Sequence, residues 1–111
     1  MGFFKNAFGD NRVLTAKDPE VQAMLTYMEK KYSAHINEYT ERKGKWYVLE
    51  CGSKKHFDFL FHHGFFKGGS VYVPGRGSTF YSKTEAYEGL LWLYDLLEEQ
   101  ENNRATDSAW F

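Results

Sequence analysis

The strongest constraint on the fold lies near the C-terminus, where residues 82–101 combine a helix start signal with an apolar centre. Ser82 and Glu85 have the spacing of a capping box, in which two side chains satisfy backbone N–H groups that a helix start leaves open. The segment 90–97 is apolar nearly all round, whereas a surface helix needs only one apolar stripe. We therefore expect a helix to about Glu101 whose second face meets the first helix, the N-terminal arm or another copy of the chain.

A shorter helix is predicted at 18–32. Asp18 is a favourable N-cap, and Pro19 suits the first helical position, where its missing N–H costs nothing. Apolar side chains then recur at helical spacing and form one stripe, which consists of Val21, Met24, Leu25, Met28 and Tyr32. This stripe predicts an amphipathic helix that packs on one face.

The segment between the helices predicts antiparallel strands. Strand character occurs at 35–42, 45–51, 56–63, 70–73 and 79–81, with glycine-containing turns between several of them. In the third of these, alternation places Phe57, Phe59 and Phe61 on the core side and His56 and His62 on the other. The fold class is therefore α+β in the order α-β-β-β(-β)-α, with an antiparallel sheet packed on one short and one long helix.

The length of 111 residues fits one domain, 1–111, with an N-terminal arm at 1–17 and a C-terminal tail at 102–111. The chain has a single cysteine and no run of about 18 apolar residues, and its first six residues lack the pattern of a signal peptide. We therefore expect a cytoplasmic protein that does not associate with membranes.

Charge is distributed unevenly along the chain, although the formal net charge is only −1. Residues 1–41 carry a net charge of −1, residues 42–83 carry +6 and residues 84–111 carry −6. Such polarity concerns binding partners rather than the fold. The aromatic share of 19% points the same way, since surface rings mark interfaces or stacking platforms.

No histidine or cysteine pattern specifies a metal or a nucleophile. On one extended strand His56 and His62 lie about 20 Å apart, at ~3.3 Å per residue, so one metal ion cannot bind both. Cys51 alternates with Tyr47 and Leu49, which predicts a buried, unreactive thiol. We expect no metal and no cofactor.

The glycine-rich segment 68–79 is not a phosphate-binding loop, because its spacing differs from that motif and Arg76 replaces the lysine. A hairpin turn is the better interpretation. Arg76 lies between two glycines and stays a candidate for binding a small anionic ligand, together with His62 and His63. Since the serines are explained by turns and caps, we predict that the protein is not an enzyme.

Two sets of side chains are candidates for binding. The basic and aromatic set consists of Lys43, Lys45, Lys54, Lys55, Phe65, Phe66, Lys67 and Arg76. Basic turns with nearby rings can follow a phosphate backbone and stack on bases. The acidic set lies on the second helix, where Glu88 and Asp95 are the candidates for contacting a basic partner, although these carboxylates can also balance the basic sheet inside the fold.

The order of helix, three strands and helix resembles the double-stranded RNA-binding domain, which implies phosphate contacts at the start of the second helix. Here Lys83 occupies that place, and the acidic Glu85 and Glu88 follow it. The stretch 45–93 also resembles a WGR-type domain, with His63-Gly64-Phe65 in place of the signature turn. In composition the chain is similar to phage accessory proteins that bind and block host or defence machinery.

We therefore expect a non-enzymatic protein that binds another macromolecule, with a protein as the expected partner, and blocks or regulates it. The first alternative is a nucleic-acid-binding module that uses the basic turns of the sheet. The second alternative is a small-ligand site near Arg76. The apolar width of the C-terminal helix separately predicts a homodimer through that helix.

Overall fold

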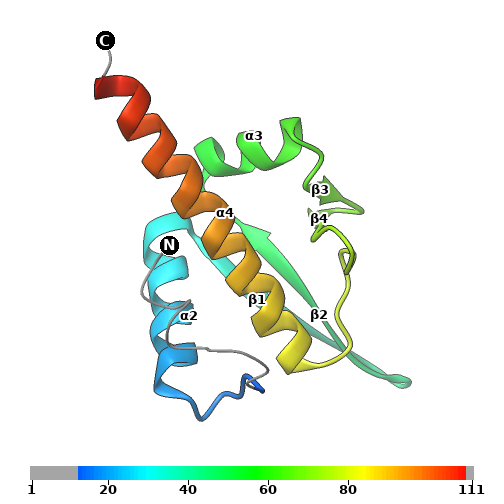
Figure 1. Ribbon diagram of the computed structural model, residues 1–111. Coiled ribbons are helices and arrows are strands. Elements are labelled where there is room, and N and C mark those ends of the chain that lie inside the picture. Colours follow the sequence, from blue (N-terminus) through cyan, green and yellow to red (C-terminus); the bar gives the residue numbers. More distant parts are fainter. Residues whose placement is uncertain (1–12, 110–111) are drawn as a thin grey trace.

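The computed structural model describes residues 13–109, with side chains as far as residue 103. Within this range the element order is α2 (Pro19–Tyr32), β1 (Ala34–Glu41), β2 (Gly44–Cys51), α3 (Lys54–His62), β3 (Phe66–Lys67), β4 (Ser70–Val71) and α4 (Lys83–Ala109) (Figure 1). The predicted α+β class is confirmed. Most of the predicted N-terminal arm, including its three phenylalanines, lies outside the described residues.

Helix α2 forms where the sequence predicts it. Pro19 is its first residue, and Val21, Met24, Met28 and Tyr32 form its buried face. The carboxylate of Asp18 accepts hydrogen bonds from the Thr15 backbone N–H and hydroxyl, so it fixes the preceding turn. The helix ends at Ser33, whose left-handed backbone (φ 51°) turns the chain into β1.

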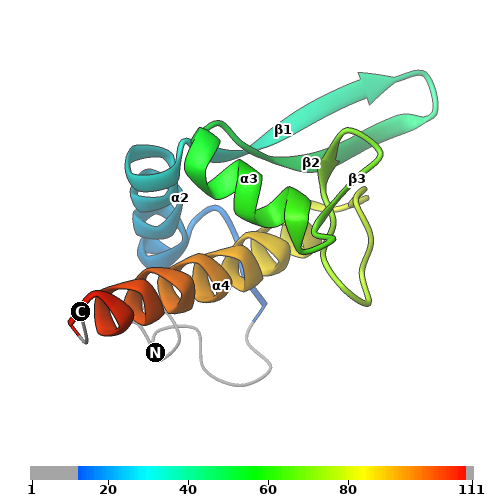
Figure 2. The ribbon, with the colours of Figure 1, turned by 90° about the horizontal axis from the view of Figure 1, so that it is seen from above.

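The two predicted long strands are also confirmed. β1 and β2 pair antiparallel from Ala34 opposite Cys51 to Glu41 opposite Gly44, which leaves a two-residue turn at Arg42 and Lys43. Figures 1 and 2 both show the turn end of this hairpin extending beyond the rest of the domain. Helices α2 and α4 lie on the same side of the hairpin in Figure 2.

The third predicted strand is wrong, because residues 54–62 form helix α3. The helix buries His56 and Leu60, which are four residues apart and therefore share one helical face. The predicted core row of phenylalanines is also wrong, since Phe61 is 57% exposed and Phe57 is only half-buried.

The short strands are reduced to fragments. β4 covers only Ser70 and Val71 of the predicted 70–73, and it pairs with β3. The hairpin turn predicted within 68–79 is confirmed at residues 74–76, because Val73 and Gly77 are bridged across them. In place of a last strand at 79–81, Phe80 alone exchanges both backbone hydrogen bonds with Tyr47 (2.7 and 2.8 Å).

Helix α4 crosses the other elements and organises the core. Its start is capped as predicted, since the Glu85 backbone N–H donates to the Ser82 hydroxyl. It continues to Ala109, eight residues beyond the predicted end. Both apolar sides are covered within the chain, by Tyr27 of α2 against Tyr94 and by Phe65 against Trp92. Of the three expected neighbours of its second face, the first helix is confirmed.

Candidate binding surface

The predicted basic residues do not form one surface. Lys43 and Lys45 lie at the turn end of the hairpin. Lys54 and Lys55 lie in the first turn of α3, which follows the opposite end of β2, so their predicted place at a hairpin turn is wrong. The two pairs are separated by most of the eight-residue strand, or about 25 Å at ~3.3 Å per residue.

Most of the other candidates are already in contact with residues of the same chain. Lys54 pairs with Asp58 (2.9 Å) on its own helix, and Lys55 pairs with Glu101 of α4 (3.2 Å). The Arg76 guanidinium donates to Glu88 (2.7 Å). The residue predicted to bind an anion is therefore paired with one of the acidic residues predicted to contact a partner.

The aromatic candidates of the loop also pack inside the fold. Phe65 meets Trp92 edge to face at 5.2 Å between ring centroids, and Phe66 meets Phe57 in the same way at 4.7 Å. The Lys67 ammonium lies 4.3 Å from the centroid of the Tyr72 ring. Both phenylalanines are therefore half-buried rather than free for a partner.

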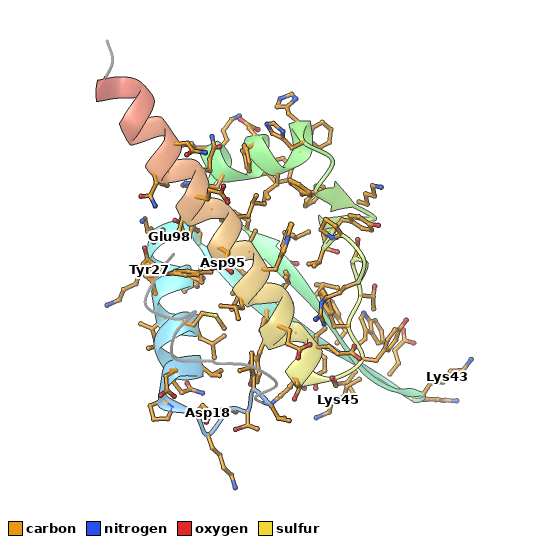
Figure 3. All side chains as sticks on the ribbon, in the orientation of Figure 1. Asp18, Tyr27, Lys43, Lys45, Asp95 and Glu98 are labelled. Carbon is orange, nitrogen blue, oxygen red and sulfur yellow. The ribbon has the colours of Figure 1, made fainter. Side chains whose placement is uncertain are left out.

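The acidic side of α4 serves the packing of the helices. Glu98 accepts hydrogen bonds from Tyr27 (2.7 Å), Tyr32 and Lys31 (2.7 Å), all of α2 (Figure 3). Burial alone raises the pKa of Glu98, but the hydrogen bonds from Lys31 and the two tyrosines outweigh it and lower the pKa. Asp95 lies one turn earlier on α4 and is half-buried. These contacts agree with the interpretation that the acidic helix balances charge within the fold.

A hydrogen-bonded chain of three side chains links α3 to α4. The Ser53 hydroxyl lies 2.7 Å from His56 Nδ1, and His56 Nε2 lies 2.7 Å from Glu101 Oε1. Because a carboxylate only accepts, Nε2 carries the proton, and in the neutral ring Nδ1 accepts from the serine. The hydrogen bond from His56 lowers the pKa of Glu101, and Lys55 acts in the same direction.

These three linked side chains are of the types that serve as nucleophile, base and orienting acid in covalent catalysis. Ser53 occupies the N-cap position of α3, but its hydroxyl makes no capping bond to the helix backbone and contacts the His56 ring instead. His56, expected on a solvent-facing strand, is buried against the Tyr32 ring at 4.6 Å. Burial also raises the pKa of the nearby Cys51 thiol, as expected for an unreactive cysteine.

Most side chains at the turn end of the hairpin are exposed, so a partner could contact them. Tyr39 is 42% exposed and stacks on Trp46, with 5.5 Å between ring centroids and 13° between planes. Tyr81, which is 75% exposed, lies beside a hollow of about 390 Å³ that Trp46, Lys43 and Lys45 also line. In the part of the chain with described side chains, Arg42 and Lys43 have no carboxylate within 4 Å. Figure 3 shows Lys43 at the far end of the molecule.

We call this the hairpin-tip surface, and its members are Tyr39, Arg42, Lys43, Lys45, Trp46 and Tyr81. Of these residues, sequence reasoning chose only the two lysines as binding candidates. The signal for Tyr39 and Trp46 was present, because they are symmetric about the turn and therefore face each other across the strands. Tyr81 had no such signal, since only the Phe80 bridge brings it to the hairpin.

Among the described residues, no group of three histidine, cysteine or acidic side chains is arranged to hold a metal ion. No helix in the same part of the chain is long and apolar enough to cross a membrane. Comparisons with protein-family models, with curated proteins and with solved structures found no match to the chain. Its function is therefore inferred from its own residues.

Proposed function

We propose that this chain is a non-enzymatic binding protein that occupies a surface of another protein through its hairpin-tip surface and so blocks or regulates it. One observation supports this most: exposed rings gather at the protruding turn end of the hairpin beside Arg42 and Lys43, which have no carboxylate partner among the described side chains. Tyrosine, tryptophan and arginine are the residues that most often dominate the binding energy of protein interfaces. Such blocking is what the compositional resemblance to phage accessory proteins implies.

The cross-strand pair supplies a rigid anchor for this contact. Tyr39 and Trp46 hold each other by stacking before any partner arrives, so little side-chain entropy is lost on binding. The neighbouring hollow is bordered by Tyr81 and by Lys43, which places an apolar and a cationic contact side by side. A partner surface with an apolar projection next to a carboxylate fits this arrangement.

Site-specific photo-crosslinking tests the proposal. A photoreactive amino acid replaces Tyr81 in one variant and Lys30, an exposed residue of α2, in the control. In extract of the producing cells we expect a discrete adduct that resists nuclease and forms only from position 81. Its loss in an Arg42→Glu, Lys43→Glu background would support the site. Equal adducts from both positions, or none from position 81, would overturn it.

Nucleic-acid binding at the same surface is the second candidate, favoured by the stacked rings beside Arg42, Lys43 and Lys45. It predicts tight binding of single strands at low salt, with an affinity that falls steeply as salt rises, because each neutralised phosphate releases counterions. Replacing Arg42 and Lys43 by alanine should then lower the salt slope by roughly 1.4, at roughly 0.7 per phosphate contact of a single strand. Replacing Lys54 and Lys55, at the other end of β2, is the matched control.

A further inference from the structure

Strand β1 has an outer edge with which no other element of the described chain pairs. β2 bonds it along its whole length, and among residues 13–109 the sheet contains only these two strands. No hydrogen bond from another described residue reaches the backbone of 35–41. A long edge strand of this kind presents a row of open N–H and C=O groups to which a further strand can add.

The register shows which groups are open. Tyr47 exchanges both of its backbone hydrogen bonds with Phe80, so it makes none with Glu38, its neighbour on β1. In an antiparallel pair, positions that bond the partner strand alternate with positions that do not. The N–H and C=O groups of Ile36, Glu38 and Thr40 therefore point outward at the edge.

A groove of about 410 Å³ lies between α2, the β1–β2 hairpin and the start of α4, and the side chains of two open positions, Ile36 and Glu38, line it. Its apolar lining includes Leu25 of α2, Ile36 of β1 and Tyr87 of α4. Because side chains alternate along a strand, every second side chain of an added strand would enter the groove. The backbone would supply affinity and the groove would supply selectivity, as in other cases of strand addition.

The charges of the groove favour a basic segment. Glu29 and Glu38 lie on its α2 and β1 sides, and Lys83 lies on its α4 side. Among the described side chains the two acids pair only with His35 (3.2 Å) and Lys45 (3.4 Å), in exposed ion pairs that contribute little. A lysine or arginine entering between the two glutamates would complement them.

The same charges disfavour a second copy of this chain as the occupant. If two copies paired their β1 edges antiparallel with all open positions overlapping, Ile36 of one copy would lie opposite Thr40 of the other. Glu38 would then lie opposite Glu38. Like charges directly opposite each other on neighbouring strands are destabilising. A strand from a different protein does not carry this penalty.

We propose that the outer edge of β1 binds an extended segment of a partner protein by strand addition, with apolar side chains and one basic side chain entering the adjoining groove. The inference rests on the proposed function only in taking the partner to be a protein. It adds a second contact, next to the hairpin-tip surface but formed by backbone groups.

Amide hydrogen exchange with a defined peptide tests this directly. The probe is the capped heptapeptide acetyl-Thr-Val-Thr-Lys-Thr-Val-Thr-amide, which places valine, lysine and valine on one side. We expect exchange at Ile36, Glu38 and Thr40 to slow by about tenfold or more as peptide is added. Asn37 and Tyr39 already bond β2 and should change little. No slowing up to the solubility limit of the peptide would overturn the proposal.

Two peptide controls separate strand addition from loose adhesion. Methylating the amide nitrogens that face the edge should abolish binding, whereas methylating the intervening ones should leave it. Replacing the probe's lysine by glutamate should weaken binding. Equal binding of the two methylated peptides would overturn strand addition.

A variant of the protein tests the edge independently. Glu38→Pro removes an N–H that β2 does not use, and proline is tolerated on edge strands for that reason. It should lose peptide binding, whereas Lys54→Ala on the distant α3 should keep it. The methylated peptides decide the matter if the proline variant does not fold. Peptide binding without a crosslink from position 81 overturns the proposed function alone, and the reverse result overturns strand addition alone.

Discussion

The junction of α2, α3 and α4 and the hairpin-tip surface use their charged side chains in opposite ways. At the junction, Glu98 and Glu101 accept hydrogen bonds from tyrosine, lysine and histidine side chains of other helices. At the tip, Arg42 and Lys43 have no carboxylate within 4 Å in the region with described side chains. The first region holds the fold together, and the second is available to a partner.

The difference shows that charge segregation along the sequence is a poor guide to a contact surface. The acidic block and the basic block have equal and opposite net charges, yet α4 uses Glu88, Glu98 and Glu101 within the chain. A charge that is already paired and partly desolvated offers less to a partner than one held in solvent. The cations of the basic block divide in the same way, since Arg76 and Lys55 are paired by α4.

The largest expected effect is on the junction. Glu98→Ala leaves the fully buried Tyr32 hydroxyl without its acceptor and should lower the free energy of unfolding by about 1–3 kcal/mol. The neighbouring Glu99 is exposed, so Glu99→Ala should change stability by less than about 0.5 kcal/mol. Urea denaturation of both variants measures this, and equal losses would remove the contrast between paired and exposed acids.

The helices and the long hairpin could be predicted because their signals are local. Asp18 with Pro19 and Ser82 with Glu85 mark helix starts whatever the rest of the chain does, and both helices begin there. The length of α4 could not be predicted, since the polar residues after Glu101 carry no apolar period. Its predicted use in a homodimer stays a prediction, and its apolar sides are covered by α2 and Phe65.

Helix α3 was missed because two periods compete in the same residues. Phe57, Phe59 and Phe61 alternate as in a strand, but His56 and Leu60 are also four residues apart, and they are the pair that the fold buries. Tertiary contacts decided between the periods, because His56 finds Glu101 only when α4 is in place. The exposed Tyr81 at the hairpin-tip surface depends on long-range contacts in the same way.

Acidification should weaken the junction before it affects the tip. The pKa values of Glu98 and Glu101 are lowered in the folded protein, so their contribution to stability is present above the unfolded value, about 4.3. It is lost as the pH falls through the folded values. Stability measured from neutral pH to about pH 3 should fall less steeply in Glu98→Gln, Glu101→Gln than in the wild type. Parallel profiles would contradict the assignment.

A smaller effect is expected at the cap of α3. Ser53→Ala removes the hydroxyl that donates to the buried His56 ring and should lower the free energy of unfolding by about 0.5–1.5 kcal/mol, the usual net contribution of one hydrogen bond. Because we propose a structural role for this serine, a fluorophosphonate probe should not label it at neutral pH. Labelling that disappears in Ser53→Ala and in His56→Gln would instead identify an activated serine and contradict the non-enzymatic proposal.

The smallest effect on stability is expected at the tip, where the effect on binding is largest. Tyr39→Ala breaks the stacked cross-strand pair and should lower the free energy of unfolding by only about 0.2–1 kcal/mol. The same change removes an exposed anchor, so the crosslink from position 81 should fall sharply while the circular dichroism spectrum is unchanged. Phe61→Ala is the matched control, because Phe61 is similarly exposed but lies on α3. A loss of crosslinking that is equal in both variants would mean that exposed rings, rather than this place in the fold, determine binding.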